Sequence, residues 1–165
     1  MRGRRRLDRL ANVMAVYRTT FPIDASSEVV WGVLVDFERY PEWNPSLPSI
    51  AGDLRVGSTV SMTLAMPGKP SPKVKAELTE VVPRQRLVWH GNVGADWLFA
   101  GDRQFIIDPG DGDTVNFTHV EDVHGLLFPL FRALMGSAIQ RHHDALNTAL
   151  TRRAEELAAG AASSH

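Results

Sequence analysis

One long amphipathic pattern ends the chain, and it constrains the fold more than any other feature of the sequence. From Leu126 to Leu157, apolar residues recur every three or four positions, as they do on one face of a helix. The clearest members of this face are Phe131, Leu134, Met135, Ala138, Ala145, Leu146, Ala149 and Leu150. A helix of this length must bury its apolar face against a large surface. We therefore expect the rest of the chain to supply that surface.

Short alternating segments precede this helix and predict strands. The first is Val16–Ile23, which is rich in residues that favour strands. Six further candidates are Ser46–Ala51, Ser58–Met66, Lys73–Val82, Arg86–Asn92, Trp97–Asp108 and Thr114–Val123. Turn-forming Pro and Gly residues separate them, and no helical pattern intervenes, which favours antiparallel pairing. The sequence thus predicts an α+β fold with a curved antiparallel sheet wrapped around the C-terminal helix.

Two short helices are expected between the first and second strands. Ser26 or Asp24 can cap a helix whose apolar residues include Val30 and Leu34. A second short helix is expected around Phe37–Tyr40 and should stop at Pro41. A sheet bent around one helix and closed by two others tends to enclose an apolar cavity. A small hydrophobic ligand is therefore the first functional hypothesis.

Length and charge divide the chain unevenly. At 165 residues it should form one domain, which we place at residues 14–158, with a basic leader at 1–13 and a frayed tail at 159–165. Five arginines and Asp8 give the leader a net charge of +4, so with a total of −1 the remainder carries −5. Such an acidic body argues against a nucleic-acid partner. Met14 heads the first strand, which leaves open whether translation starts at Met1 or Met14.

Several kinds of chemistry find no support in the sequence. There is no cysteine, which excludes disulfides and thiolate-bound metals and fits a cytoplasmic location. No apolar run approaches the roughly 20 residues of a membrane span, so no stable membrane insertion is expected. His142 and His143 are adjacent on a helix and should point apart, and His119 and His124 are five residues apart. We therefore predict no metal site and no cofactor.

Alternation places three polar residues on the inner face of the sheet: Arg103, His119 and Glu121. Buried charges are costly unless they are paired, so Arg103 and Glu121 are expected to pair across neighbouring strands, with His119 nearby. This set could grip a carboxylate, phenol or carbonyl, and His119 would titrate near neutrality. The alternative is a structural ion pair at the end of the sheet, open to water.

The predicted ligand-binding residues combine this polar set with apolar side chains on the same faces. They are Trp43, Val60, Met62, Leu64, Val74, Ala76, Leu78, Trp89, Arg103, Phe105, Phe117, His119, Glu121, Phe131 and Met135. Trp43 lies in a loop flanked by prolines and is either a lid on the cavity or a packing anchor. The helical spacing of Phe131 and Met135 suits either a cavity roof or plain core.

Five segments, taken in order, resemble the SRPBCC (START-like) superfamily, and within it the bacterial polyketide cyclase/dehydrase and lipid-transport group. They are Pro41–Pro45, Pro83–Trp89, Gly101–Phe105, Thr114–Glu121 and Gly125–Leu127. The resemblance implies a helix-grip fold with seven antiparallel strands and an internal cavity for lipids, sterols or polyketides. Where members often carry an acidic residue and a histidine, this chain has Asp102 and Arg103, which should favour an anionic or carbonyl-bearing ligand.

Three functions follow as hypotheses. The first is non-catalytic binding of a small hydrophobic molecule in the cavity. The second is a polyketide cyclase or aromatase, with Arg103, His119 and Glu121 orienting the substrate. The third is a protein-interaction module that uses a groove beside Trp43, which requires exposed apolar surface there and little enclosed volume. The sequence leaves the ligand and the oligomeric state open.

Overall fold

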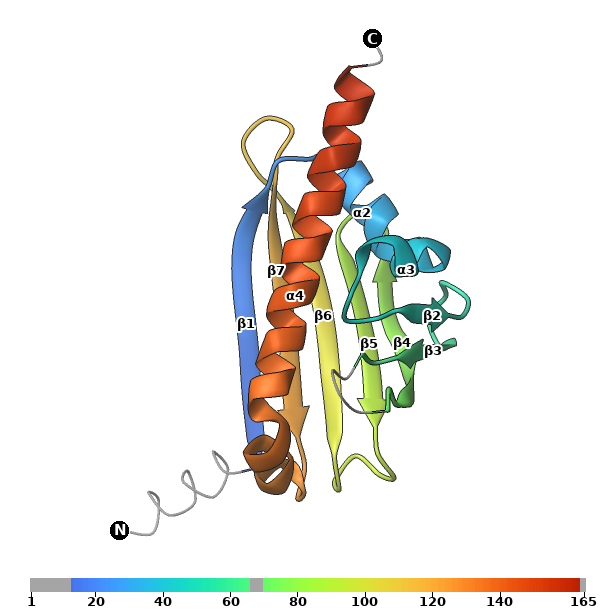
Figure 1. Cartoon of the computed structure of the whole chain (residues 1–165), viewed down its shortest axis with the longest axis vertical. Helices are drawn as coiled ribbons and strands as arrows, with labels where there is room; N and C mark the ends of the chain where they lie inside the picture. Colours follow the sequence, from blue (N-terminus) through green and yellow to red (C-terminus); the bar gives the residue numbers. More distant parts are fainter. Residues whose placement is uncertain (1–12, 66–69, 164–165) are drawn as a thin grey trace, which may run out of the picture.

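A single curved sheet and one long helix dominate the structure, a computed structural model that describes residues 13–65 and 70–163 (Figure 1). Within these ranges, the side chains of Met135 and Ile139 are not described. The sheet has seven antiparallel strands in the order β1-β7-β6-β5-β4-β3-β2. The helix α4 runs across its concave face (Figure 1). The predicted helix-grip architecture is confirmed.

The elements follow the predicted order. They are β1 (Met14–Ile23), α2 (Ser27–Val35), the 3-10 turn η1 (Phe37–Arg39), α3 (Tyr40–Trp43), β2 (Ser49–Ala51), β3 (Thr59–Thr63), β4 (Lys73–Val82), β5 (Arg86–Asn92), β6 (Ala100–Pro109), β7 (Val115–His124) and α4 (Phe128–Ala162). Ser26 caps α2 as predicted, because its Oγ accepts a hydrogen bond from the Val29 amide at 3.4 Å.

Several boundaries differ from the predictions. Pro41 does not stop the second short segment but lies in the first turn of α3, where its missing N–H costs no hydrogen bond. The strands β2 and β3 are shorter than predicted. The helix α4 continues to Ala162, past the predicted end at Ala158. The predicted leader, except Val13, and Met66 lie outside the described residues.

The packed core lies between the sheet and the C-terminal half of α4. Side chains from the middle of β6 and β7, such as Phe105 and Phe117, are fully buried there, and Leu146 and Leu150 of α4 cover them. The short helices add to the same core through Leu34. The N-terminal half of α4 lies over the other end of the sheet, where the packing leaves a cavity. No helix in the described part of the chain has the length and apolar character needed to cross a membrane.

Candidate functional site

An apolar cavity of about 250 Å³ lies between the sheet and the N-terminal half of α4. Strands β3 to β7 form its wall, and α4 contributes Phe131, whose ring stacks on Phe99 at 4.2 Å between centroids. The predicted ligand-binding residues that line it are Met62, Leu64, Val74, Ala76, Trp89, Arg103, Glu121 and Phe131. The β5–β6 connection adds Val93, which the sequence analysis did not identify.

Other predicted ligand-binding residues do not line this cavity. Five lie in the packed core with no exposed surface: Val60, Leu78, Phe105, Phe117 and His119. Alternation placed them on the correct face, but the tertiary packing buries them completely and away from the cavity. The side chain of Met135 lies outside the described residues.

Trp43 packs inside the protein instead of covering the cavity. Its side chain is buried, and its ring lies 4.7 Å from that of Tyr40 between centroids. The Tyr40 hydroxyl in turn donates to the carbonyl of Leu34 at 2.8 Å. The structure thus matches a packing anchor and not a lid. A groove for a protein partner would gain no exposed aromatic surface from Trp43.

The predicted pair between Arg103 and Glu121 is present in the cavity wall. These residues are direct cross-strand partners on β6 and β7, and an Arg103 NH2 group donates to Glu121 Oε1 at 2.9 Å. Each side chain is only 15% exposed. Burial by itself raises the pKa of Glu121, but the charge of Arg103 and a contact with His143 more than offset it and lower the pKa to about 2. Glu121 is therefore ionised at neutral pH.

His119 lies behind this pair, deeper in the protein. Its Nδ1 is 2.7 Å from Asn147 Oδ1 of α4, and its ring lies between Phe105 and His143. Burial, followed by the positive charge of Arg103 and the proximity of His143, lowers the pKa of His119 to about 3. The prediction that His119 titrates near neutrality is wrong, because alternation along a strand does not reveal how deeply a side chain is buried.

His143 completes the cluster, and the sequence analysis missed it. Its ring stacks on that of His119 at 3.8 Å between centroids and 4° between planes. Its Nε2 is 3.1 Å from Thr19 Oγ1, and its Nδ1 is 3.8 Å from Glu121 Oε2. His143 stands three and seven residues before Leu146 and Leu150. This spacing places it on the buried face of the helix and was the signal available in the sequence.

Besides Asn147 Nδ2, three polar atoms of this cluster have no hydrogen-bond partner among the described residues. They are His119 Nε2, Glu121 Oε2 and His143 Nδ1. Because Asn147 Oδ1 can only accept, His119 Nδ1 carries the proton and Nε2 is an acceptor. A carboxylate oxygen is also an acceptor. These two acceptor atoms therefore lack a donor, which a proton on His143 or a bound hydroxyl group would supply.

The same residues offer one metal-ligand atom each, and these atoms lie within 4.8 Å of one another. The sequence analysis did not predict this grouping. A metal prefers to lie in the plane of each imidazole ligand, but the two rings are parallel and 3.8 Å apart. Arg103 holds only the other carboxylate oxygen, Oε1. One ring would have to rotate before the two histidines and Glu121 Oε2 could share a metal.

The charges of the site nearly cancel. Arg103 and Glu121 neutralise each other, and His119 is uncharged at neutral pH. The expected preference for an anionic ligand therefore loses its basis, because the guanidinium already has its counter-ion. A neutral carbonyl or hydroxyl group remains compatible with the cavity wall.

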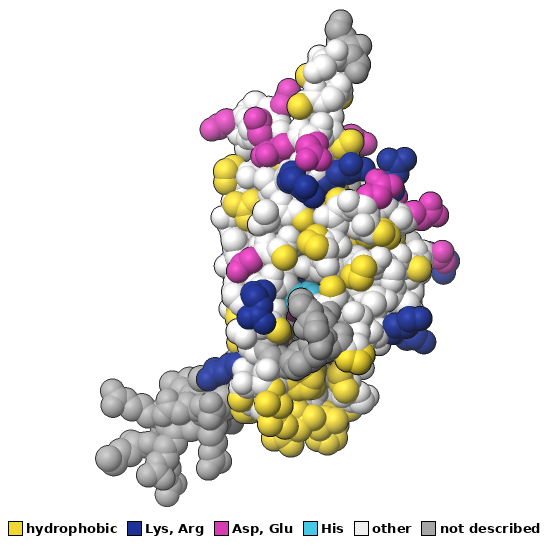
Figure 2. All heavy atoms as spheres, in the orientation of Figure 1, with side chains coloured by type: hydrophobic (Ala, Val, Ile, Leu, Met, Phe, Trp, Pro, Cys, Tyr) yellow, Lys and Arg dark blue, Asp and Glu magenta, His cyan; other side chains and the backbone are white. Residues whose placement is uncertain are grey.

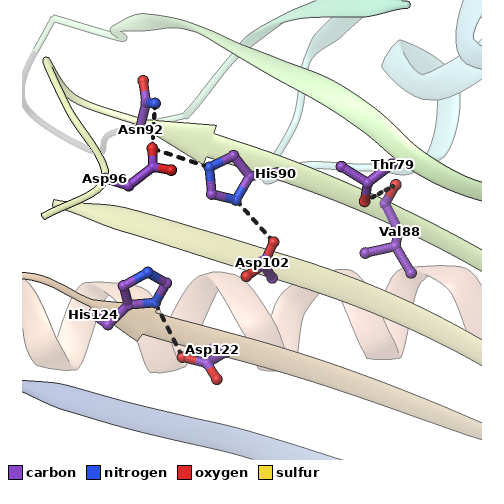
Figure 3. A network of polar contacts seen from close by, with 8 residues as sticks. All are labelled: Thr79, Val88, His90, Asn92, Asp96, Asp102, Asp122 and His124. Atoms are coloured by element: carbon purple, nitrogen blue, oxygen red, sulfur yellow. Dashed lines mark hydrogen bonds and ion pairs between the residues drawn. The ribbon is translucent and has the colours of Figure 1, made fainter. Parts of the chain in front are cut away.

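A second polar network lies near the end of the β5–β6 hairpin (Figure 3). The His90 ring bridges Asp102 at 2.9 Å and Asp96 at 3.3 Å, and Asn92 donates to Asp96 at 2.6 Å. Partial burial lowers the pKa of His90, but these two carboxylates more than offset it, so the pKa is raised. The network ties the hairpin connection to the body of the sheet beside the cavity.

Residues 14–155 match the family described as polyketide cyclase / dehydrase and lipid transport. The chain belongs to this family. No curated protein matches it.

Solved structures share the family's fold at low sequence identity. The di-domain ARO/CYC StfQ of the steffimycin biosynthetic pathway superposes with a TM-score of 0.74 at 12% identity, over 96% of this chain and 55% of its own. The chain thus spans about half of that protein. The Zhui aromatase/cyclase from Streptomyces sp. R1128 superposes with a TM-score of 0.68 at 16% identity, over 86% of this chain and 94% of its own. A START superfamily protein from Mycobacterium smegmatis superposes with a TM-score of 0.66 at 23% identity, over 86% of this chain and 98% of its own.

Proposed function

We propose that this protein binds a small, uncharged, largely hydrophobic molecule in the cavity beneath the N-terminal half of α4. The observation that carries the proposal is the Arg103–Glu121 pair, which forms a polar point in an otherwise mainly apolar wall. Binding sites for small molecules typically combine an apolar lining with a few polar groups that orient the ligand. The family, whose description includes lipid transport, supports the same class of ligand.

The size and charge of the cavity narrow the proposed ligand. Its volume of about 250 Å³ lies just below the range of roughly 300–1,000 Å³ that is usual for ligand pockets, which favours a compact molecule. Because Arg103 and Glu121 already neutralise each other, a carbonyl could accept from the guanidinium or a hydroxyl could donate to the carboxylate without adding charge. The polar group of the ligand should therefore face β6 and β7.

Filling the cavity should abolish binding. Ala76 of β4 lines the cavity and is 8% exposed, so Ala76→Phe would place a ring where the ligand lies. We expect its affinity for the neutral fluorophore N-phenyl-1-naphthylamine to fall at least tenfold, measured by fluorescence titration. The matched control is Glu77→Phe, which adds the same ring on the exposed face of the same strand.

The comparison requires that both variants remain folded, which circular dichroism and thermal unfolding would establish. Equal affinity in folded Ala76→Phe and Glu77→Phe would contradict binding in this cavity. Native mass spectrometry of the unmodified protein, purified from its own host, would then identify a co-purifying natural ligand by its mass.

Catalysis on a poly-carbonyl substrate is the second candidate function. The unpartnered Glu121 Oε2 lies 3.8 Å from His143 Nδ1, an arrangement that could move a proton beside the cavity. His119 would contribute as a neutral acceptor and not as an acid, because its pKa is lowered to about 3. Two of the structural neighbours are described as aromatase/cyclases, which is consistent with such chemistry.

An isosteric change tests this second candidate. Glu121→Gln should lower the rate of cyclisation of a model poly-β-ketone about 100-fold, which is the lower end of what one acid–base group contributes. Asp122→Asn is the matched control, because Asp122 is the next residue of β7 and its side chain pairs only with His124 among the described residues. Product analysis by liquid chromatography measures both rates. Equal rates in the two variants would reject the enzyme hypothesis and leave the binding hypothesis standing.

A further inference from the structure

Large apolar side chains are exposed together at the end of the molecule where the cavity lies. Trp97 is 69% exposed, Leu126 65%, Leu130 58% and Leu134 72%, and Val93 on the same hairpin as Trp97 is 54% exposed. We call these five residues the apolar rim. Figure 2 shows a dense apolar surface at the lower end of the molecule, where α4 begins. Single exposed leucines are ordinary, but a continuous patch usually marks a binding surface.

The rim is built by contacts between the start of α4 and the β5–β6 hairpin. The amide of Leu126 donates to the carbonyl of Trp97 at 2.9 Å. Gly125 lies so close to the hairpin that an added Cβ would stand 2.6 Å from the carbonyl oxygen of Leu98, and its φ is +129°. Leu126 lies in the turn before α4, and Leu130 and Leu134, four residues apart, share one side of the helix. The exposure of these side chains is thus fixed by the fold.

The rim borders the cavity. Val93 belongs to both, and the Phe99–Phe131 stack in the cavity wall lies on the two elements that carry the rim. A molecule that enters or leaves the cavity at this end would pass the rim. A partner that covers the rim would therefore have direct access to the proposed site.

Charge indicates which partner fits. The carbonyl of Val13 accepts from the amide of Gly125 at 2.9 Å, so the leader joins the described chain beside Leu126. That leader carries five arginines and one aspartate. Residues 125–143, which include the first half of α4 and the turn before it, contain Arg132 and Arg141 and no acidic residue. Acidic side chains instead gather toward the opposite end of the molecule in Figure 2.

We propose that the apolar rim docks on the surface of an anionic lipid bilayer with its side chains in the interfacial region; the net charge of +4 on residues 1–13 favours such a surface. Apolar and aromatic side chains flanked by arginines are the chemistry that such a surface selects. A second copy of the chain fits less well, because a symmetric dimer through the rim would bring two basic leaders together. The docking does not depend on whether the cavity is occupied.

Vesicle sedimentation of the full chain tests the proposal. We expect binding to vesicles of 30% phosphatidylglycerol in phosphatidylcholine at low salt, and at least tenfold weaker binding to pure phosphatidylcholine. Leu130→Gln/Leu134→Gln should weaken binding to the anionic vesicles at least tenfold. Leu157→Gln is the matched control, because Leu157 is 43% exposed on the same helix at its far end. Replacing Arg2, Arg4, Arg5 and Arg6 by Gln should weaken it by about fivefold per arginine.

The fluorescence of Trp97 measures independently how deeply the apolar rim enters the bilayer. Brominated lipids should quench part of the tryptophan emission of the unmodified chain, and Trp97→Phe should remove that quenching. Trp43 and Trp89 are buried, and Trp31 of α2 is partly buried against the core. Absence of binding to any vesicle by the folded chain would overturn the proposal. So would binding that Leu130→Gln/Leu134→Gln leaves unchanged. A dimer in sedimentation velocity that this double variant dissociates, without vesicle binding, would assign the rim to self-association instead.

Discussion

His119→Phe is expected to flatten the dependence of protein stability on acid pH. Burial keeps His119 neutral in the folded protein, with a pKa of about 3, whereas the unfolded chain takes up a proton near the ordinary value of 6.5. Stability is therefore fully present above pH 6.5 and falls as the pH decreases toward 3, since the unfolded state binds the proton first. Over this window the loss amounts to about 5 kcal/mol.

A loss of this size matters because whole domains are stable by only about 5–15 kcal/mol. At neutral pH, His119→Phe should itself cost about 1–3 kcal/mol, since Asn147 Oδ1 would lose its donor. Urea unfolding at intervals between pH 7 and pH 3.5 measures both effects. His124→Gln serves as the control, because its partly exposed side chain lies at the end of β7 and not in the core. If the free energy of unfolding falls with decreasing pH as steeply in His119→Phe as in the unmodified protein, His119 does not control acid unfolding.

Arg103→Met is expected to lower the free energy of unfolding by about 3 kcal/mol at neutral pH, because it leaves the buried Glu121 carboxylate without its counter-ion. The double variant Arg103→Met/Glu121→Leu should recover most of this loss. Well-packed apolar residues often replace a buried ion pair at little cost, since they remove both desolvation penalties. The two residues are direct cross-strand partners, so their interaction is measurable as one coupling energy.

A double-mutant cycle by urea unfolding at pH 7 gives this coupling energy. The control pair is Arg84–Glu28, which has a similar separation of 3.1 Å but side chains that are 60% and 74% exposed. Glu28→Leu should cost less than about 1 kcal/mol, because water already screens that pair. If Arg103→Met lowers the free energy of unfolding no more than Glu28→Leu does, the pair in the cavity wall behaves as a surface ion pair.

The part of the candidate site that follows from strand periodicity was predictable from the sequence. Arg103 and Glu121 each stand in an alternating segment, and a short turn joins these segments into a hairpin. Both inward orientation and cross-strand pairing follow from that pattern. The order of the strands and the closing helix was predictable for the same reason, since apolar periodicity is a local property of the chain.

His143 and the depth of His119 were not predictable in this way. The contact between their rings depends on how far α4 is shifted and rotated over the sheet, which packing decides across a sequence separation of about two dozen residues. The depth of burial, in turn, sets the pKa of His119. The boundary between packed core and cavity has the same origin, because Phe105 and Arg103 share one face of β6, yet Phe105 is fully buried and Arg103 borders the cavity.

Local patterning alone thus established the elements, their order, the inner face of each strand and the pairing of Arg103 with Glu121. Only the three-dimensional packing decided which inner residues form solid core, which border empty space, and which apolar residues of α4 stay exposed at the rim. The physical reason is that hydrophobic periodicity is encoded over a few neighbouring residues. Burial, cavity volume and pKa depend instead on contacts between segments that are distant in the chain.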